Sequence, residues 1–302
     1  MDGPVFQRLE NERERPGLLH LALFFCTLLA TLYCGTELLP RFADASVSEH
    51  FFSVLSHPLI LLQGAPFSLA LLFILGVHEF GHFGSARRLG VRATWPYFLP
   101  GPPYLSIGTF GAFIRLKGAI PDRGSLMEIG ALGPVAGFAA SVGVTLAGYG
   151  ALALGYRVPT DLGANVNLPL GYWLLNGLFL GRWEHAAIFF ENPILAASWI
   201  GFFVQGLNLL PAGQLDGGHV LYAFARRRHF YISRALGLGL FALMPWGLHF
   251  GIWAVLLLVL GYGHPACVWE ERPLNGRQVA LGAAALLIFV LCFHPMPFSF
   301  QN

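Results

Sequence analysis

The chain has 302 residues, of which 55% are hydrophobic and only 11% are charged. Soluble domains carry about 25% charged residues, so this composition excludes a large soluble domain and indicates a polytopic membrane protein surrounded by a lipid bilayer. The net charge of +2 is too small to indicate a nucleic-acid partner. The cysteines show no CxxC spacing and are expected to be buried apolar residues: Cys26, Cys34, Cys267 and Cys292.

The N-terminal part is expected to contain a tail and one membrane span. Residues 1–17 are polar and charged, which predicts a cytosolic tail. Residues 18–65 are expected to hold the first transmembrane helix, followed by a re-entrant or interfacial segment that is interrupted at His57-Pro58. A cleaved signal peptide is the alternative for the first apolar run, because Ala43-Asp44-Ala45 resembles a cleavage site.

A second apolar run, residues 67–89, carries a His-Glu-x-x-His motif near its end. Residues i and i+4 of a helix share one face, roughly 6 Å apart along the axis, so His78 and His82 can bind one metal ion. Glu79 lies next to the first histidine, where a carboxylate can take a proton from water. Arg87-Arg88 follows, and the positive-inside rule places this end of the helix on the cytosolic side. Ionisable side chains at membrane depth are costly, which favours a functional site over a chance match.

Residues 93–123 differ in kind from the apolar runs around them. The proline-rich segment 95–103 cannot form a helix, because proline lacks a backbone donor and fixes φ. Residues 104–117 contain Gly108 and Gly111 and are rich in aromatic and β-branched residues, which favours strand. We therefore expect a short membrane-associated β-ribbon that lines a cavity, with a plain cytosolic loop as the alternative.

Two further spans are expected over residues 129–154 and 186–210. Gly133 and Gly137 in the first of these form a small-xxx-small face that allows close helix packing, and we assign them no catalytic role. The weakly charged stretch between the two spans, residues 155–185, is expected to form a non-cytosolic loop.

A catalytic zinc ion needs three protein ligands and one open position for water. Asp216 follows a helix break rich in proline and glycine and precedes a second basic cluster, residues 226–228, so its expected depth matches that of His82. Of the five aspartates it is the one in an apolar setting, and we predict it to be the third ligand. His219 is the competing candidate, and an N-cap is the structural alternative for Asp216. Asn208 is predicted to orient the substrate or an oxyanion, with an interhelical hydrogen bond as the equal alternative.

Residues 231–302 are expected to form the C-terminal transmembrane helices. The apolar run from 233 to 262 is longer than one span needs, and residues 245–247 predict a break in it. The predicted fold class is therefore an all-α polytopic membrane protein with six or seven transmembrane helices and a short β-ribbon after the motif-bearing helix.

The paired motifs resemble those of the site-2 protease family of intramembrane zinc metalloproteases. They read His78-Glu79-Phe80-Gly81-His82 and Asn208-x-x-Pro211-x-x-x-Leu215-Asp216-Gly217. The resemblance extends over residues 66–230, which are expected to form the catalytic membrane core. It implies that the two histidines and Asp216 bind Zn²⁺, that Glu79 is the catalytic base, and that the substrates are transmembrane proteins.

The expected function is hydrolysis of peptide bonds within or near transmembrane segments of membrane-anchored substrates. A helical substrate must unwind, and the edge of the predicted ribbon can satisfy its freed backbone groups by β-augmentation. A membrane zinc transporter is one alternative, which would need acidic or histidine residues on several helices; a non-catalytic relative that binds membrane proteins is another. The expected location is multi-pass, in a bacterial or archaeal cell membrane or a plastid membrane, with the site near the cytosolic face, and no oligomeric state is predicted.

Overall fold

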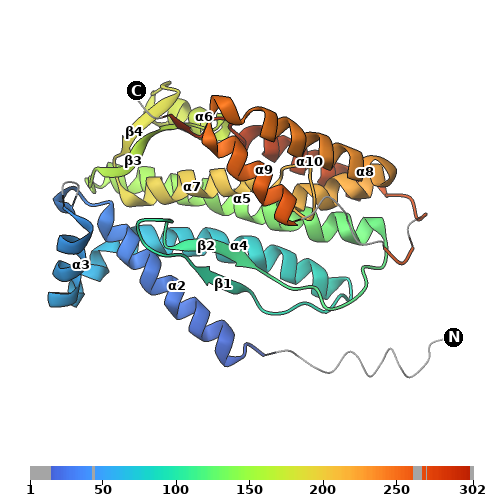
Figure 1. The fold of residues 1–302 in the computed structure, drawn as a ribbon, viewed down its shortest axis with the longest axis horizontal. Helices are drawn as coiled ribbons and strands as arrows, with labels where there is room; N and C mark the ends of the chain where they lie inside the picture. The colour runs from blue at the N-terminus through green and yellow to red at the C-terminus, as the bar shows by residue number, and fades with distance from the viewer. Residues whose placement is uncertain (1–14, 43–44, 261–266, 270, 300–302) are drawn as a thin grey trace.

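The protein is described from a computed structural model that covers residues 15–42, 45–260, 267–269 and 271–299. Residues 1–14, most of the predicted cytosolic tail, lie outside the described residues. The described chain is mostly helical, with two small β-sheets. Figure 1 shows the longer helices running roughly side by side, with α5 in the middle of the molecule.

The N-terminal part contains the predicted first span and a short helical connection. The elements are α2 (Leu18–Glu37), η1 (Pro40–Phe42), α3 (Val47–Ser56) and η2 (Pro58–Gly64). Ser46 and Glu49 form a capping box that starts α3, since each side chain hydrogen-bonds the backbone N–H of the other residue. Pro58 opens the 3₁₀ helix that leads into α4 (Ala65–Arg88).

The predicted β-ribbon is present after α4, but its first strand begins earlier than expected. Strands β1 (Tyr97–Pro100) and β2 (Thr109–Phe113) are antiparallel and form a two-stranded sheet. β1 lies in the proline-rich segment, where the single proline of the strand occupies its last position. Proline is tolerated at the end of an edge strand, because only one ladder donor is lost there.

Helix α5 (Arg123–Ala153) organises the packing of the core. Asp122 caps its N-terminus, where the carboxylate accepts the backbone N–H of Ser125 at 2.7 Å. The helix packs against α4 on one side and against α7, α8 and α10 on others. Pro134 lies inside it and removes one intrahelical donor close to the candidate site.

A second sheet and a shortened helix replace the predicted fourth span. Strands β3 (Thr160–Asn167), β4 (Ala186–Phe190) and β5 (Phe298–Ser299) form a sheet of order β4-β3-β5, with α6 (Leu170–Leu180) between the first two strands. The expectation of one helix over 186–210 is wrong at its start, because α7 (Pro193–Asn208) begins only after a strand. Asn192 caps α7 and Pro193 occupies its first turn, which fixes the start of the helix there.

The C-terminal part consists of α8 (Asp216–Ala242), η3 (Met244–Trp246), α9 (Leu248–Leu260) and α10 (Gly276–Cys292). The break predicted at residues 245–247 is confirmed. Helix α8 is interrupted directly before the basic cluster 226–228, because Ala225 has non-helical backbone angles and joins two helical parts across a kink.

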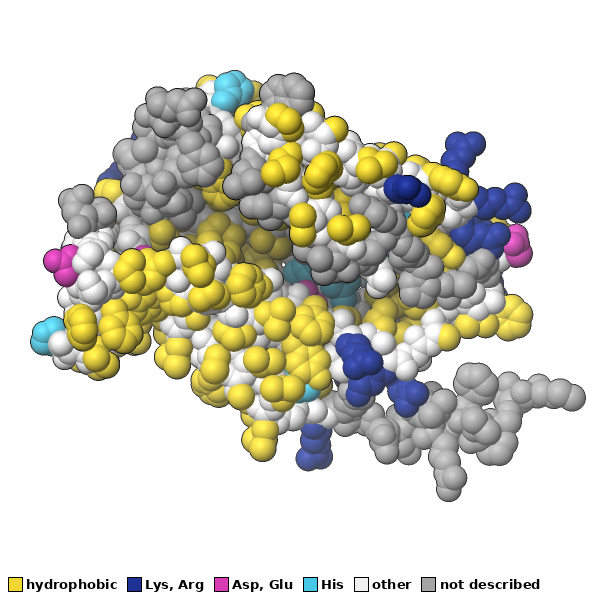
Figure 2. Space-filling model, in the orientation of Figure 1, with side chains coloured by type: hydrophobic (Ala, Val, Ile, Leu, Met, Phe, Trp, Pro, Cys, Tyr) yellow, Lys and Arg dark blue, Asp and Glu magenta, His cyan; other side chains and the backbone are white. Residues whose placement is uncertain are grey.

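By length and composition, three helical segments of the described chain can cross a membrane. They are Leu18–Glu37, Pro58–Arg88 and Arg123–Ala153. The predicted count of six or seven spans is therefore not confirmed. Figure 2 shows apolar side chains over much of the visible face, with most of the visible Lys and Arg side chains towards one end.

Candidate metal centre

The two motif histidines come together because they lie one turn apart on α4. His78 and His82 are both buried, and their Nε2 atoms are 3.0 Å apart. Leucine, alanine and phenylalanine, which are common in membrane helices, dominate α4 before the two histidines. Arg87 and Arg88 lie in the last turn, where positive charge interacts favourably with the negative end of the helix dipole. The spacing therefore produces the shared face that the sequence predicts.

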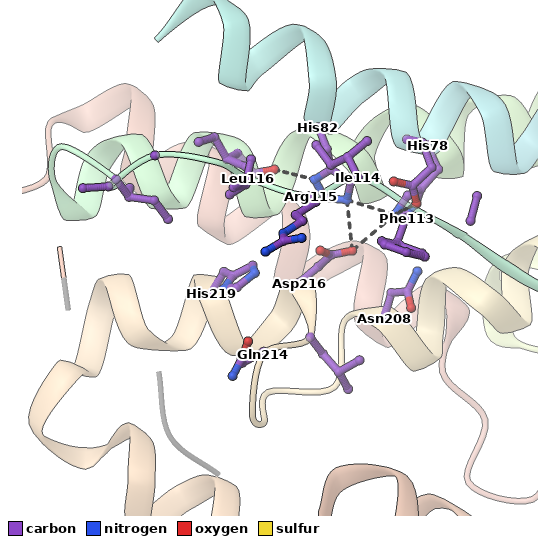
Figure 3. A pocket seen from close by; sticks show the side chains of 17 residues that line it. His78, His82, Phe113, Ile114, Arg115, Leu116, Asn208, Gln214, Asp216 and His219 are labelled. Carbon is purple, nitrogen blue, oxygen red and sulfur yellow. Dashed lines mark hydrogen bonds and ion pairs between the residues drawn. The ribbon is translucent and has the colours of Figure 1, made fainter. Parts of the chain in front are cut away.

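Asp216 reaches the two histidines from the first residue of α8. Its Oδ2 lies 3.3 Å from the Nε2 of His78 and 3.3 Å from the Nε2 of His82 (Figure 3). The N-cap position of α8 is Leu215, so Asp216 does not cap this helix. The irregular segment between α7 and α8 thus brings a carboxylate from more than a hundred residues away to the histidine pair.

The opposite ring nitrogens of both histidines have hydrogen-bond acceptors. The Nδ1 of His82 donates to the backbone carbonyl of Ile129 on α5 at 2.7 Å, and the Nδ1 of His78 lies 2.8 Å from the Oε1 of Gln205 on α7. A neutral imidazole with hydrogen on Nδ1 has a lone pair on Nε2. Both Nε2 lone pairs therefore point to the place where Asp216 also presents an oxygen.

This arrangement fits a divalent metal ion. Two imidazole nitrogens and a carboxylate oxygen within 4.8 Å of one another repel as bare lone pairs, and a cation between them removes that repulsion. The donor set of two histidines and one aspartate suits zinc, and metal-ligating histidines characteristically donate their other N–H to a carbonyl. His78, His82 and Asp216 are therefore the residues that would hold the metal.

Glycines on α5 provide the room for these side chains. A Cβ placed on Gly133 would lie 2.1 Å from the Nε2 of His82, and one on Gly137 would lie 2.4 Å from the Nε2 of Gln205. The small-xxx-small pair that we interpreted only as packing thus also faces the metal centre. No catalytic role follows, but the histidine and glutamine positions depend on these glycines.

The remaining predicted site residues line one cavity of about 530 Å³ beside the histidines. Glu79 is buried, and its Oε1 lies 3.9 Å from the Nε2 of His78. Its carboxylate accepts the backbone N–H of Ile114, in the chain that continues from β2. Asn208 is the last residue of α7 and lies at the cavity wall near Phe113 (Figure 3). Figure 2 shows a hollow in this region, with histidine and acidic side chains visible inside it.

His219 lines the same cavity but is not part of the three-residue cluster. It lies three residues beyond Asp216, and its Cβ packs over Gly130 of α5. The structure therefore places Asp216, and not His219, with the histidine pair.

Sequence reasoning missed Gln205 and the carbonyl of Ile129. Every residue has a backbone carbonyl, so the sequence does not indicate which one accepts a hydrogen bond from a histidine. Gln205 is visible in the sequence as a polar residue in a mostly apolar helix, one turn before Asn208. Polar residues at membrane depth are functional candidates by default, and this rule would have found it.

Fold and site together define an apolar helical protein with a buried His₂Asp centre suited to a divalent metal. A family model described as "Peptidase family M50" matches residues 66–242. The chain belongs to this family, the site-2 protease family, which confirms the predicted resemblance.

Several curated relatives carry names of zinc metalloproteases. "Probable zinc metalloprotease EGY2, chloroplastic" of Arabidopsis thaliana is 32% identical over 257 residues, which cover 80% of this chain and 44% of that protein. The protein of the same name from Oryza sativa subsp. indica is 30% identical over 266 residues, covering 84% and 47%. "Probable zinc metalloprotease EGY1, chloroplastic" of Arabidopsis thaliana is 29% identical over 326 residues, covering 96% and 56%.

The chain spans about half the length of the curated relatives it matches. The family and these names support the predicted enzyme class, a zinc metalloprotease, and zinc as the metal.

Proposed function

We propose that the protein is an intramembrane zinc metalloprotease that hydrolyses peptide bonds within or near transmembrane segments of membrane-anchored substrates. The observation that carries this proposal is the convergence of the His₂Asp cluster and Glu79 at one wall of a cavity whose other wall is the chain of β2. Such a cavity brings a metal, a base and a peptide-binding backbone within reach of one another.

Each polar residue of the centre has a proposed role. His78, His82 and Asp216 would bind zinc, which when bound acidifies a water molecule and polarises the scissile carbonyl. Glu79 takes the proton of the attacking water and delivers it to the leaving amine. The N–H of Ile114 hydrogen-bonds the Glu79 carboxylate and so orients the base towards the cavity.

Asn208 is proposed to orient the substrate or to stabilise the oxyanion. Among the described residues its side-chain amide makes no hydrogen bond, although it lines the cavity. That observation supports availability for the substrate over the alternative, an interhelical hydrogen bond. An amide donor that points at developing negative charge stabilises the transition state of comparable reactions by about 3 kcal/mol.

The β-ribbon supports recognition of an unwound substrate. β2 pairs with β1 along one edge, and beyond β2 the backbone N–H and C=O of Arg115 both bond Thr94. Backbone groups alternate in direction along a strand, so those of Ile114 and Leu116 face the opposite side, where residues 112–116 line the cavity. The N–H of Ile114 already bonds Glu79, which leaves the C=O of Ile114 and the backbone groups of Leu116 for a substrate. A substrate strand that adds to this edge satisfies the backbone groups that lipid cannot satisfy.

The site is proposed to lie within the membrane, close to its basic side. His82 precedes Arg88 by six residues of continuous helix, which is roughly 9 Å along the axis. Arg87 and Arg88 mark the cytosolic side, or the equivalent stromal side of a plastid membrane, by the positive-inside rule. The chloroplastic names of the relatives support the plastid membrane among the membranes considered.

Transport of zinc is not favoured by the geometry. A transporter needs a succession of ligand clusters along a path. In the part of the chain that the structure describes, one group of histidine, cysteine and acidic side chains is close enough to hold a metal ion.

Cleavage of a single-span reporter by the purified protein in detergent tests the proposal. Glu79→Gln is expected to retain zinc and to lose cleavage by at least about a hundredfold, because the base is removed while the ligands remain. Glu49→Gln on α3, an exposed carboxylate outside the cavity, is the matched control and is expected to cleave as the wild type does. Wild-type cleavage by Glu79→Gln, or zinc flux in liposomes without any cleavage, would contradict the proposal.

A further inference from the structure

We propose that Gln205 is a positioning residue of the metal centre, whose side-chain oxygen holds His78 in the tautomer that leaves Nε2 free for zinc. The inference rests on the proposed metal-binding role of His78. It assigns a specific function to a buried polar side chain that no step of the proposed reaction uses.

The geometry places the amide on the ring nitrogen opposite the metal site. The Oε1 of Gln205 lies 2.8 Å from the Nδ1 of His78, and the Gln205 side chain is fully buried. An imidazole whose Nδ1–H is held by an acceptor has its lone pair on Nε2, which is the atom that faces Asp216 and His82. The contact therefore orients the ring and selects its tautomer at once.

The two histidines differ in how this is achieved. The Nδ1 of His82 faces the carbonyl of Ile129, which can only accept a hydrogen bond, so the tautomer of His82 is fixed by the backbone. The Nδ1 of His78 faces an amide, which can accept through oxygen or donate through nitrogen. His78 is thus the ligand whose tautomer depends on the identity and orientation of a side chain.

A second observation supports this assignment of Gln205. With Oε1 directed at His78, the Nε2 of Gln205 is buried without a hydrogen-bond partner in the described structure. A buried unpaired amide nitrogen is unfavourable, so packing alone would favour an apolar residue at this position. The oxygen is the part of the side chain that has a partner, and that partner is a proposed metal ligand.

The position of Gln205 depends in turn on α5. A Cβ on Gly137 would lie 2.4 Å from the Nε2 and 2.8 Å from the Oε1 of Gln205. Gln205 also lies one turn before Asn208 on α7, and the segment after α7 leads to Asp216. One helix therefore carries the support for His78 and leads into the third proposed ligand.

Equilibrium zinc affinity, measured by competition with a chromophoric chelator on purified full-length protein, tests the inference without any cleavage assay. Gln205→Met keeps the length of the side chain and removes the acceptor, and we expect a 10- to 100-fold weaker zinc affinity. Gln205→Glu keeps an acceptor oxygen at the same distance and is expected to bind zinc within about threefold of wild type, or more tightly. Ser198→Ala, a buried polar position on the same helix whose hydroxyl donates to the backbone carbonyl of Leu195 and makes no contact with His78, is the control and should leave the affinity unchanged.

Two results would overturn the inference. Wild-type affinity in Gln205→Met would show that the acceptor is not needed, and equal weakening in Gln205→Glu and Gln205→Met would show that Gln205 acts only through packing. If Gln205→Met does not fold, Gln205→Asn is the substitute, because it withdraws the amide oxygen by one methylene and is expected to weaken zinc binding similarly. The variant His78→Ala separates this inference from the proposed function. Unchanged zinc affinity in His78→Ala would contradict the proposed metal centre itself, and not only the role of Gln205.

Discussion

Helices α2 and α5 are both long and apolar enough to cross a membrane, yet they contribute differently to the protein. In the most apolar stretch of α2, 22% of the residues are buried inside the protein, against 56% in α5. α2 directs large side chains such as Phe25 and Leu29 outwards, whereas α5 presents Gly133 and Gly137 to its neighbours. Hydropathy therefore identifies both helices, but the burial of small residues distinguishes the helix that shapes the site from the helix with an exposed apolar face.

The largest effect is expected from a methyl group added at the metal centre. In Gly133→Ala the new Cβ would lie 2.1 Å from the Nε2 of His82, so the ring must move away from the proposed ligand position. We expect at least about a hundredfold loss of reporter cleavage, with reduced bound zinc, because displacement of a reacting group by 1 Å costs about this much. Gly143→Ala, on the same helix where nothing lies within 4 Å, is the control and should cleave within twofold of wild type.

A second, smaller effect is expected where the backbone of α5 lies close to Gly81 of α4. A Cβ on Gly81 would lie 2.6 Å from the carbonyl oxygen of Leu132, and a backbone contact cannot relax as a side chain can. Gly81→Ala is expected to lower the free energy of unfolding by about 1–3 kcal/mol, measured by denaturant titration in detergent. Gly84→Ala on the same helix has open space around it and is expected to be neutral or slightly stabilising. Equal stability of both variants would contradict the contrast between the packed and the exposed face of α4.

The polar ends of α4 and α5 are joined by an ion pair with a modest expected contribution. Arg88 donates to Glu128 at 2.5 Å, and Gln278 of α10 donates to the other carboxylate oxygen at 3.3 Å. The Arg88 side chain is half exposed, so solvent screening limits the coupling to about 0.5–1 kcal/mol. A double-mutant cycle with Arg88→Met and Glu128→Gln measures this energy, and a coupling near zero would show that helix packing alone joins the two ends.

The smallest effect is expected on the exposed apolar side of α2. Leu29 is 57% exposed, and lipid can fill the space that Leu29→Ala leaves. The free energy of unfolding should change by less than about 0.5 kcal/mol. Thr31→Ala on the inner face, where the hydroxyl is 2.7 Å from that of Ser68 on α4, is the matched variant and should cost about 1 kcal/mol. A larger cost for Leu29→Ala than for Thr31→Ala would mean that this face of α2 packs against protein.

The parts of the site that could be predicted are those that local geometry determines. The spacing of His78 and His82 specifies a shared helix face, and Asp216 is identifiable because few acidic residues lie in apolar surroundings. The roles of Gln205 and Ile129 could not be predicted in this way. Their contacts with the histidines depend on which faces of α5 and α7 pack against α4, and no local sequence pattern determines that.

The fold was predictable to a similar extent. The long apolar helices and the β-ribbon followed from length, glycine and proline, while the β3-β4-β5 sheet did not. The strand Ala186–Phe190 is a short apolar run directly before a helix, and periodicity cannot separate such a strand from the start of that helix.

The zinc content of purified protein tests the central claim most directly. Elemental analysis of the wild type, Asp216→Ala and His219→Ala distinguishes the two candidate third ligands. The geometry predicts a single zinc ion per chain in the wild type and in His219→Ala, and little or none in Asp216→Ala, because Asp216 supplies the oxygen 3.3 Å from both histidines. Full zinc content in Asp216→Ala together with its loss in His219→Ala would contradict the proposed metal centre.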